Sequence, residues 1–324
     1  MPRLRSIEFC AGAGGQALGL ERAGFAHDLL LDSDADCCAT LRHNRPSWTV
    51  VCADMKTFVP QRYDDLDLMA AGLPCPPFSI AGKQLGHEDE RDLFPAALRL
   101  IEQTGPKFVL IENVRGFLSQ GFRPYREKIA DAFRDLGYQL DWRLYNATDF
   151  GVSQSRSRVT IVAGKSDYWG QFDFPAPTKA EPKPVGELLF DLMAARGWRG
   201  AEHWKTQAQG IAPTIVGGSK KHGGPDLGPT RARATWKTMG VNGGSIAEDA
   251  PDTDFAGLPR LTTRMVARLQ GFPDDWHFTG KKTSAYRQVG NAFPPPVAQA
   301  VATSIATAIA TTEGTARQSA VAAE

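Results

Sequence analysis

One cysteine of this chain stands where it could act as a nucleophile. Cys75 follows the strand-like run 66–71 and is framed by three prolines in the segment GLPCPPFS. Most cysteines are inert core residues, but Cys75 does not lie in an apolar run, unlike Cys37, Cys38 and Cys52. No histidine or aspartate partner is evident from local spacing, which argues against a protease-like site. The pattern places a thiol on a stiffened loop at the end of a strand.

Three further polar residues stand at the ends of strand-like runs. Glu112 closes the run FVLIENV and could be a surface cap, a metal ligand or a hydrogen-bonding acid. Arg156 and Arg158, in QSRSR, precede another strand. Strand periodicity predicts that both arginines point to the same side. They would form a surface ion pair unless that strand end faces a ligand.

A glycine loop follows the first strand directly. In IEFCAGAGGQALG, the residues Gly12, Gly14 and Ala17 satisfy the pattern G-x-G-x-x-G/A, and Asp32 ends the next strand. Glycines let the backbone approach a ligand, and the acid binds ribose hydroxyls. The loop therefore predicts a dinucleotide or the adenosyl group of a methyl donor, with a ligand-free tight turn as the alternative.

These residues need an α/β framework to bring them together. Apolar, strand-like runs cover residues 6–10, 27–31, 48–51, 66–71, 108–112, 139–145 and 159–163. Helix-like stretches at 16–23, 35–43, 91–103 and 125–136 lie between several of them. This alternation predicts a mostly parallel sheet covered on both faces, with ligands at the carboxyl ends of its strands.

The alternation ends near Phe172. The linker PAPTKAEPKP and a stretch rich in glycine and proline follow it, and helical periodicity returns at 261–270 and 296–309. The last residues, 313–324, have no aromatic or long aliphatic anchor, so we expect them to fray. Residues 196–240 carry eight basic residues against two acidic ones, a bias that most often marks a solvated, loop-rich surface.

Composition bounds the class of protein. Of 324 residues, 42% are hydrophobic and 23% charged, as in soluble proteins, and no apolar run reaches the ~18 residues of a membrane helix. The start, MPRLRSIEF, leaves no room for a signal peptide, so we expect a cytoplasmic location. Five cysteines without a CxxC pair argue against a disulfide framework or a structural zinc site. A net charge of +1 does not exclude DNA, whose footprint can be local.

Six motifs together resemble those of the DNA (cytosine-5)-methyltransferase family, in family order. They are the glycine loop, Cys75 in PCPPFS, Glu112 in ENV, Arg156 and Arg158 in QSRSR, RLTTRMVARLQGFPDDW and AYRQVGNAFPPPVAQAV. The resemblance spans roughly residues 5 to 305. It implies a Rossmann-like, mostly parallel α/β sheet of the S-adenosylmethionine-dependent methyltransferase class, with a small, loop-rich target-recognition domain.

The resemblance also implies the chemistry. The Cys75 thiolate would add to carbon 6 of a flipped cytosine, which makes carbon 5 nucleophilic toward the methyl group of S-adenosylmethionine. Glu112 would bind the base edge, and Arg158, with Arg156 nearby, the base carbonyl. No metal is implied.

For the cofactor, the family pattern maps onto twelve residues. They are Cys10, Ala11, Gly12, Ala13, Gly14 and Gly15 for the methionine part, Asp32 and Ser33 for ribose and adenine, Asp54 and Met55 for adenine, Pro74 beside the methyl group, and Asn291 from the last motif. The chain departs from the pattern at Glu8, where aspartate is usual, at Cys10, where an aromatic is usual, and at Ser33, where a bulkier stacking residue is usual. These departures imply looser packing around adenine.

The resemblance divides the chain into a catalytic domain, 1–180, completed by about 275–312, and a target-recognition domain, 181–274. The basic stretch then becomes the expected DNA face, with phosphate or base contacts from Lys220, Lys221, Arg231 and Arg233. The expected partner is double-stranded DNA, bound by a monomer of a bacterial modification enzyme or orphan methylase that a separate restriction endonuclease can accompany.

Three other functions fit part of the pattern. A nicotinamide-dependent oxidoreductase would explain the glycine loop and Asp32, but neither Cys75 nor the ENV and QSRSR strands. A non-catalytic DNA-binding regulator would have lost the nucleophile. The tRNA-methylating branch shares the catalytic motifs, but no Cys-Phe-Thr signature of that branch follows QSRSR.

Overall fold

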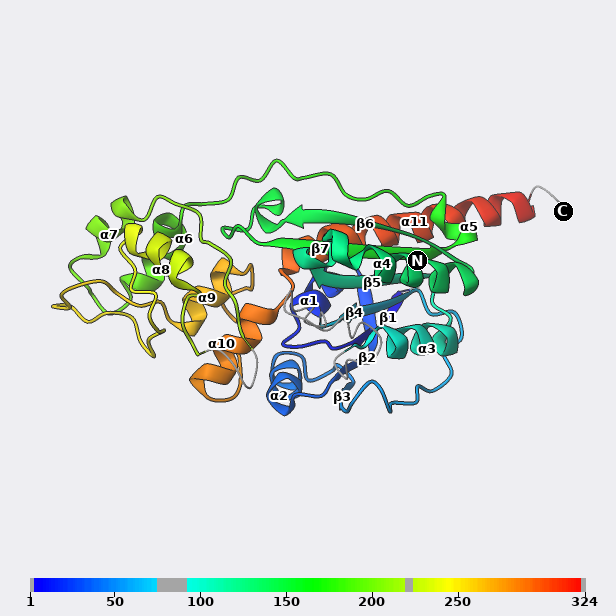
Figure 1. Cartoon of the computed structure of the whole chain (residues 1–324), viewed down its shortest axis with the longest axis horizontal. Coiled ribbons are helices and arrows are strands. Elements are labelled where there is room, and N and C mark those ends of the chain that lie inside the picture. The colour runs from blue at the N-terminus through cyan, green and yellow to red at the C-terminus, as the bar shows by residue number, and fades with distance from the viewer. Residues whose placement is uncertain (1–2, 75–91, 219–223, 322–324) are drawn as a thin grey trace.

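A seven-stranded sheet forms the larger part of the molecule (Figure 1). The computed structural model describes residues 3–74, 92–218 and 224–321. The strands are β1 (Leu4–Phe9), β2 (Phe25–Asp32), β3 (Val50–Cys52), β4 (Leu68–Gly72), β5 (Phe108–Val114), β6 (Tyr138–Asn146) and β7 (Ser157–Lys165). Their spatial order is β3-β2-β1-β4-β5-β7-β6. All pairs are parallel except β5–β7 and β6–β7, so the predicted mostly parallel sheet is confirmed.

Helices cover both faces of this sheet. On one face α1 (Gly15–Arg22) and α11 (Pro295–Val321) pack over the side chains of Leu110 and Val162. On the other, α3 (Phe94–Thr104) and α4 (Arg123–Asp135) pack over Val109 and Ile111. Because both faces are covered, β5 is continuously apolar from Phe108 to Ile111. The remaining helices of this part are α2 (Ala35–Asn44), α5 (Ser166–Trp169) and the short 3-10 turns Arg115–Leu118, Gln120–Phe122 and Ala147–Phe150.

Close packing of α1 against α11 brings the C-terminal part of the chain back to the sheet. A side chain at Gly19 would lie 2.5 Å from Ala298 Cβ and 2.7 Å from the Pro295 carbonyl oxygen, so only glycine allows this approach. The buried residues Val301 and Ile305 of α11 extend the same core. The sheet comes from the N-terminal half of the chain, and one of the helices that cover it comes from the C-terminal end.

Residues 185–292 form a second lobe with its own core, on the left of Figure 1. Its helices are α6 (Val185–Met193), α7 (Ala201–Gln207), α8 (Thr230–Thr238), α9 (Thr263–Leu269) and α10 (Lys282–Asn291). Trp204 and Trp236 are almost completely buried in it. The helices are short and the connections long, so a few large aromatic side chains supply much of the core.

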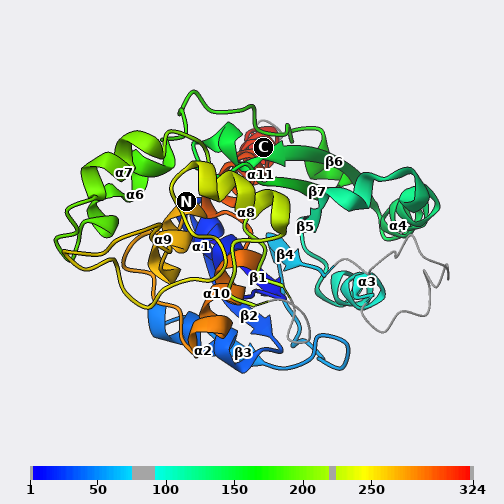
Figure 2. The same cartoon turned by 60° about the vertical axis from the view of Figure 1, so that its left-hand side comes forward.

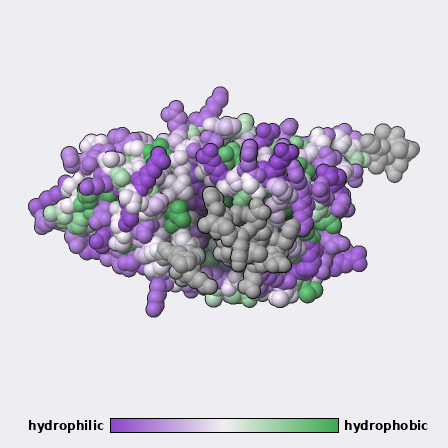
Figure 3. All heavy atoms as spheres, viewed as in Figure 1, coloured by the Kyte–Doolittle hydropathy of each residue, from purple (hydrophilic) through white to green (hydrophobic). Residues whose placement is uncertain are grey.

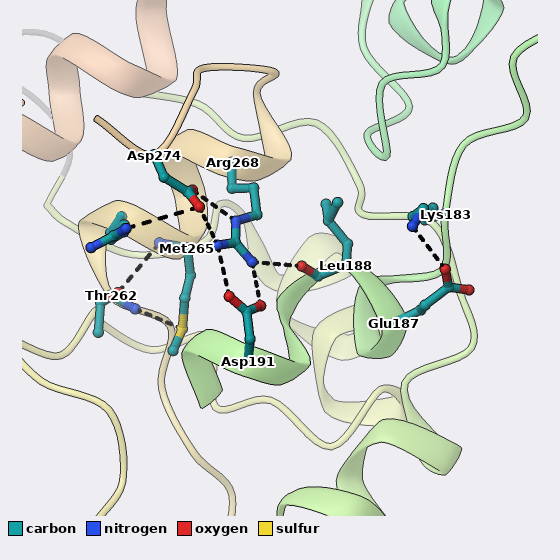
Figure 4. A network of polar contacts seen from close by, with 9 residues as sticks. Lys183, Glu187, Leu188, Asp191, Thr262, Met265, Arg268 and Asp274 are labelled. Carbon is teal, nitrogen blue, oxygen red and sulfur yellow. Dashed lines mark hydrogen bonds and ion pairs between the residues drawn. The ribbon is translucent and has the colours of Figure 1, made fainter. Parts of the chain in front are cut away.

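Arg268 joins three segments of this lobe through hydrogen bonds and ion pairs (Figure 4). Its guanidinium donates to the Leu188 carbonyl oxygen at 2.9 Å and to the carboxylates of Asp191, on α6, and Asp274, beyond α9. These hydrogen bonds lower the pKa of both aspartates. The network links α6, α9 and the segment after α9.

The structure continues α11 to Val321, into the segment 313–324 that we expected to fray. The Glu313 carboxylate lies 2.7 Å from the Lys107 ammonium. This ion pair adds to the buried apolar contacts that α11 makes with the sheet earlier in the helix. None of the helices within the described ranges is long and apolar enough to cross a membrane.

Candidate active site

The carboxyl ends of β1, β4 and β5 meet at one edge of the sheet. Their register places Phe9 beside Ala71, and Gly72 beside Glu112. The glycine loop, Leu73–Pro74 and Glu112–Val114 therefore leave the sheet side by side, as the strand alternation predicts. Pro74 is exposed at this edge, and Cys75, the next residue, lies outside the described residues.

Glu112 and Arg158 form an ion pair at this edge. Arg158 Nε lies 2.7 Å from Glu112 Oε1, and the side chains of Arg158 and Glu112 are only 14% and 11% exposed. The antiparallel register explains the pairing, because Val114 stands opposite Arg158 and Glu112 opposite Thr160. Residues two apart on neighbouring strands share a face and lie within reach of a long side chain. A carboxylate and a guanidinium thus stand together where a planar, polar ligand could contact both.

Arg156 does not join this pair. Its side chain is 1% exposed, and its guanidinium donates to the carbonyl oxygens of Ile215, Gly290 and Ala292 at 2.6, 2.8 and 3.1 Å. Burial, followed by the charge of Arg158, lowers its pKa well below the usual value. Of the two arginines grouped by strand periodicity, the structure brings only Arg158 to Glu112.

The glycine loop is held in a tight turn between β1 and α1. Cys10 and Gly12 have φ of 52° and 53°, and the Gly14 amide donates to the Ala11 carbonyl oxygen at 3.0 Å. Apart from Gly12 and its two chain neighbours, no described residue has an atom within 4 Å of a Cβ built at Gly12, so the described part of the chain leaves space in front of that residue. A side chain at Gly15, in contrast, would lie 2.3 Å from the Phe293 carbonyl oxygen. Gly12 therefore gives access to a ligand, and Gly15 gives close packing against the C-terminal segment.

Asp32 joins this loop to the next strand end. Its Oδ2 accepts from the Gly12 amide at 2.8 Å, and its Oδ1 from the Asp34 amide at 2.7 Å. Met55 is buried beside the loop, with its sulfur 3.4 Å from that of Cys10. An open glycine turn, a fixed carboxylate and an apolar sulfur wall fit an adenosyl ligand.

The cysteine of this loop is not a second candidate nucleophile. Burial, followed by the charges of Asp32, Asp54 and Glu8, raises the pKa of Cys10 above its ordinary value. The side chain therefore stays a neutral thiol near neutral pH. Only a thiolate is strongly nucleophilic, so Cys10 fits a wall of the site and not its chemistry.

The other predicted cofactor residues lie around this edge at different depths. Ser33 and Asp54 are exposed, and Asp54 Oδ1 accepts from the Lys56 amide at 2.9 Å. Asn291, exposed at the end of α10, donates from Nδ2 to the Gly218 carbonyl oxygen at 3.2 Å. Asn291 thus bonds within the second lobe, whereas Phe293, two residues further on, packs against Gly15 of the glycine loop.

Sequence patterns did not single out three residues that make buried contacts around this edge. Trp276 donates from its indole to the Ala13 carbonyl oxygen at 3.1 Å and so holds the glycine loop. Gln154 and Gln270 are fully buried and bonded to each other at 2.5 Å. Their only signal was polarity within recognised motifs, QSRSR and RLQGFP.

The predicted DNA contacts are separated by the structure. Arg231 and Arg233 are exposed on α8, at the front of the second lobe in Figure 2, and neither has an ion-pair partner within the described ranges. Arg196 and Arg199, from the same basic stretch, are paired with aspartates 252 and 254 at 2.6 and 2.9 Å. Lys220 and Lys221 lie outside the described residues. The surface in Figure 3 is largely hydrophilic, with hydrophobic residues in scattered patches.

Comparison with known proteins shows which families and folds this chain resembles. A model described as "C-5 cytosine-specific DNA methylase" matches residues 4–307. The type II methyltransferase M.NgoMIV of Neisseria gonorrhoeae is 53% identical over 299 residues, which cover 91% of this chain and 95% of that protein. The type II methyltransferase M.NaeI of Lentzea aerocolonigenes is 52% identical over 93% of this chain and 74% of its own length.

Solved structures share the fold at low identity. A prophage-encoded DNA modification methyltransferase of E. coli aligns with a TM-score of 0.66 at 21% identity, over 94% of this chain and 99% of the other. A DNMT2 variant of Spodoptera frugiperda aligns with a TM-score of 0.64 at 17% identity, over 93% and 99%.

Proposed function

Because this chain belongs to the C-5 cytosine-specific DNA methylase family, we propose that it methylates a cytosine within one specific duplex sequence as part of a type II restriction-modification system. The family fixes the reaction, transfer of a methyl group to carbon 5 of cytosine in DNA. The observation that carries the site assignment is the Glu112–Arg158 ion pair. It stands at the strand edge that also bears the glycine loop and Pro74.

The reaction begins with Cys75. Its thiolate adds to carbon 6 of the cytosine, and the electron pair of the 5,6 double bond moves so that carbon 5 becomes nucleophilic. S-adenosylmethionine supplies the electrophilic methyl group. Loss of the carbon 5 proton then lets the thiolate leave carbon 6, which restores the double bond.

Glu112 and Arg158 stabilise the base during this addition. The Glu112 carboxyl group faces ring nitrogen 3 and the amino group, and the Arg158 guanidinium faces the ring carbonyl, where negative charge develops. Their mutual ion pair fixes both side chains before the base arrives, so little reorganisation is needed in the transition state.

The glycine-loop edge would hold the methyl donor. Residues 10–15 and Asp32 surround the open space at Gly12. Met55 lies against Cys10, and Ser33 and Asp54 are exposed nearby for the adenosyl group. Pro74 and Asn291 close the edge from β4 and α10.

The target base must leave the duplex to reach this edge, at a cost of about a few kcal/mol. Contacts with the phosphate backbone help to offset that cost, and the unpaired arginines of α8 are suited to them. The relatives named type II methyltransferases support a role in modification. A separate endonuclease would recognise the same sequence.

Cys75→Ser tests the covalent mechanism. The variant should lose methylation, since a hydroxyl is a far weaker nucleophile, while its binding to duplex DNA stays within about threefold of wild type. Methylation would be followed by bisulfite sequencing of genomic DNA from a host without 5-methylcytosine, which also identifies the target sequence. Turnover by the variant would refute the covalent step.

A trapping experiment tests the same step independently. With S-adenosylmethionine present, DNA with 5-fluorocytosine at the mapped target should form a complex with wild-type protein that resists denaturation. After methyl transfer, fluorine cannot leave carbon 5 as a proton does, so the thiolate stays bound to carbon 6. Cys75→Ser serves as the control that must not trap.

Methylation of tRNA in place of DNA by the wild-type protein would instead favour the RNA-directed branch.

A further inference from the structure

Two buried side-chain bridges join the second lobe to the strand that carries Arg158. Arg156 binds the Ile215 carbonyl oxygen on one side and those of Gly290 and Ala292 on the other. Gln154 accepts from the Ile215 amide at 3.0 Å and donates to Gln270, whose amide donates to the Ala292 carbonyl oxygen. Both bridges thus connect Ile215 with the turn after α10. We call the side chains of Gln154, Arg156 and Gln270 the polar seam.

Among the described residues, no carboxylate forms an ion pair with the seam, since Glu112 pairs with Arg158 instead. The three side chains are at most 1% exposed, and the hydrogen bonds of the guanidinium within the described ranges all go to backbone carbonyls. Its Nε has no hydrogen-bond partner within the described part of the chain. A buried charge without an ionic partner is expensive to keep. The planar guanidinium holds its N–H donors in a fixed arrangement. Its advantage here is therefore the exact placement of its partners and not a gain in net stability.

Glycine packing tightens the same junction. A Cβ at Gly290 would lie 2.4 Å from the Gly217 amide nitrogen, and one at Gly217 would lie 2.4 Å from the Arg287 carbonyl oxygen. Two backbones therefore touch directly beside the seam. Val216, between Ile215 and Gly217, is 50% exposed. The seam thus fixes the position of a surface segment of the second lobe.

Arg158 lies two residues beyond Arg156 and pairs with Glu112. We propose that Arg156, with Gln154 and Gln270, is a positioning residue that holds the second lobe at a fixed position relative to the Glu112–Arg158 pair. DNA bound to the lobe then presents its flipped base at the correct height over that pair. This inference rests on the proposed function.

The test compares Arg156→Lys with a control at the far end of the sheet. Lysine keeps the charge but loses the fork that reaches three carbonyl oxygens. Lys107→Met serves as the control, because it removes a buried charge from the opposite end of β5 and leaves the seam intact. Both proteins would be compared at temperatures equally far below their unfolding midpoints, using duplexes with the mapped target or a one-base variant of it.

Arg156→Lys should lower kcat about 10- to 100-fold, as expected for a displacement of ~1 Å. KM for DNA should change less than about threefold, and the preference for the target over the one-base variant should fall about tenfold. Lys107→Met should keep both values. Gln270→Met, which breaks only the second bridge, should act in the same direction with a smaller effect. Wild-type kcat and preference in Arg156→Lys, or equal losses in Lys107→Met, would overturn the proposal.

Amide exchange separates this proposal from the function itself. In Arg156→Lys, exchange should accelerate at 212–218 and 290–293 but not in α8 or β4. Unchanged exchange at 212–218 would reject the seam whatever the activity. Failure of wild-type protein to methylate DNA would reject the proposed function, while the exchange result would still stand.

Discussion

The ion pair of Glu112 and Arg158 makes a direct prediction for turnover. Glu112→Gln keeps the shape of the side chain but removes the charge that faces Arg158 at 2.7 Å. Removal of one such preorganised group typically costs about 10²- to 10³-fold in kcat. Single-turnover methyl transfer at saturating DNA would measure it, with KM for DNA changing little. A kcat within threefold of wild type would exclude Glu112 from the chemistry.

Glu8 gives a pH prediction at the same scale. Burial, followed by the charge of Asp32, raises the pKa of this carboxyl group well above its usual value, and its Oε2 has no hydrogen-bond partner within the described ranges. The folded protein therefore holds a proton that the unfolded chain releases above about pH 4.5. The free energy of unfolding should fall as the pH rises above that value.

Glu8→Gln mimics the protonated acid and should remove this dependence. Denaturant unfolding should show the variant to be more stable than wild type at pH 8 and of similar stability at pH 4. A variant that is less stable than wild type at pH 8 would contradict a neutral Glu8.

Residue types and spacing singled out candidate residues, the ordered motifs indicated the chemistry, and neither showed which contacts each residue makes. Glu112, Arg158 and Asp32 were found because each stands at the end of an apolar run, where the sheet must expose it. Arg156 looked equivalent to Arg158, yet it turns into a buried junction whose other members, Ile215 and Gly290, are distant in sequence. Sequence periodicity states which side a residue faces, not which segment covers that side.

The exposed arginines of helix α8 lead to a prediction for the salt dependence of DNA binding. Arg231→Ala and Arg233→Ala should each reduce the slope of log K against log salt by about 0.9, because each unpaired arginine neutralises about one phosphate. Arg196→Ala is the matched control in the same lobe, since Asp249 and Asp252 already neutralise that side chain. Fluorescence anisotropy with a duplex that contains the target, at several salt concentrations, would measure the slopes. Equal slopes for all three variants would remove α8 from the interface.

The two lobes differ in how far their elements could be predicted. All seven strands were predicted to within a few residues. In β4 and in residues 108–111 the signal was a continuous apolar run, as expected of buried parallel strands, whereas β6 is an antiparallel edge strand that is partly exposed. Within the second lobe, α9 was anticipated, whereas α6, α7, α8 and α10 were not. Their short sequences show little periodicity, and tryptophans 204 and 236, far apart in sequence, supply the core. Contacts between residues that are distant in sequence determine such a core, so local sequence patterns do not predict it.

At the scale of the whole molecule, a cluster around Lys107 closes the sheet with the C-terminal helix. The Lys107 side chain is 8% exposed and lies 2.8 Å from Asp67 and 2.7 Å from Glu313. Burial lowers the pKa of Lys107, but the hydrogen bonds that its ammonium donates to Asp67, Glu313 and Asp65 outweigh burial and leave the pKa raised. The stabilisation is therefore complete at neutral pH and is lost only in strong base, above about pH 10.4.

Lys107→Met should lower the free energy of unfolding by about 3–5 kcal/mol, because it leaves the buried Asp67 carboxylate without its cation. Glu313→Gln should cost less, because Glu313 is 33% exposed and Asp67 still pairs with Lys107. Urea unfolding at pH 7 would rank the two variants. Glu313→Gln could instead lower the free energy of unfolding as much as Lys107→Met. The main contribution of this cluster would then be the attachment of α11 through Glu313, and not the pairing of the buried lysine with Asp67.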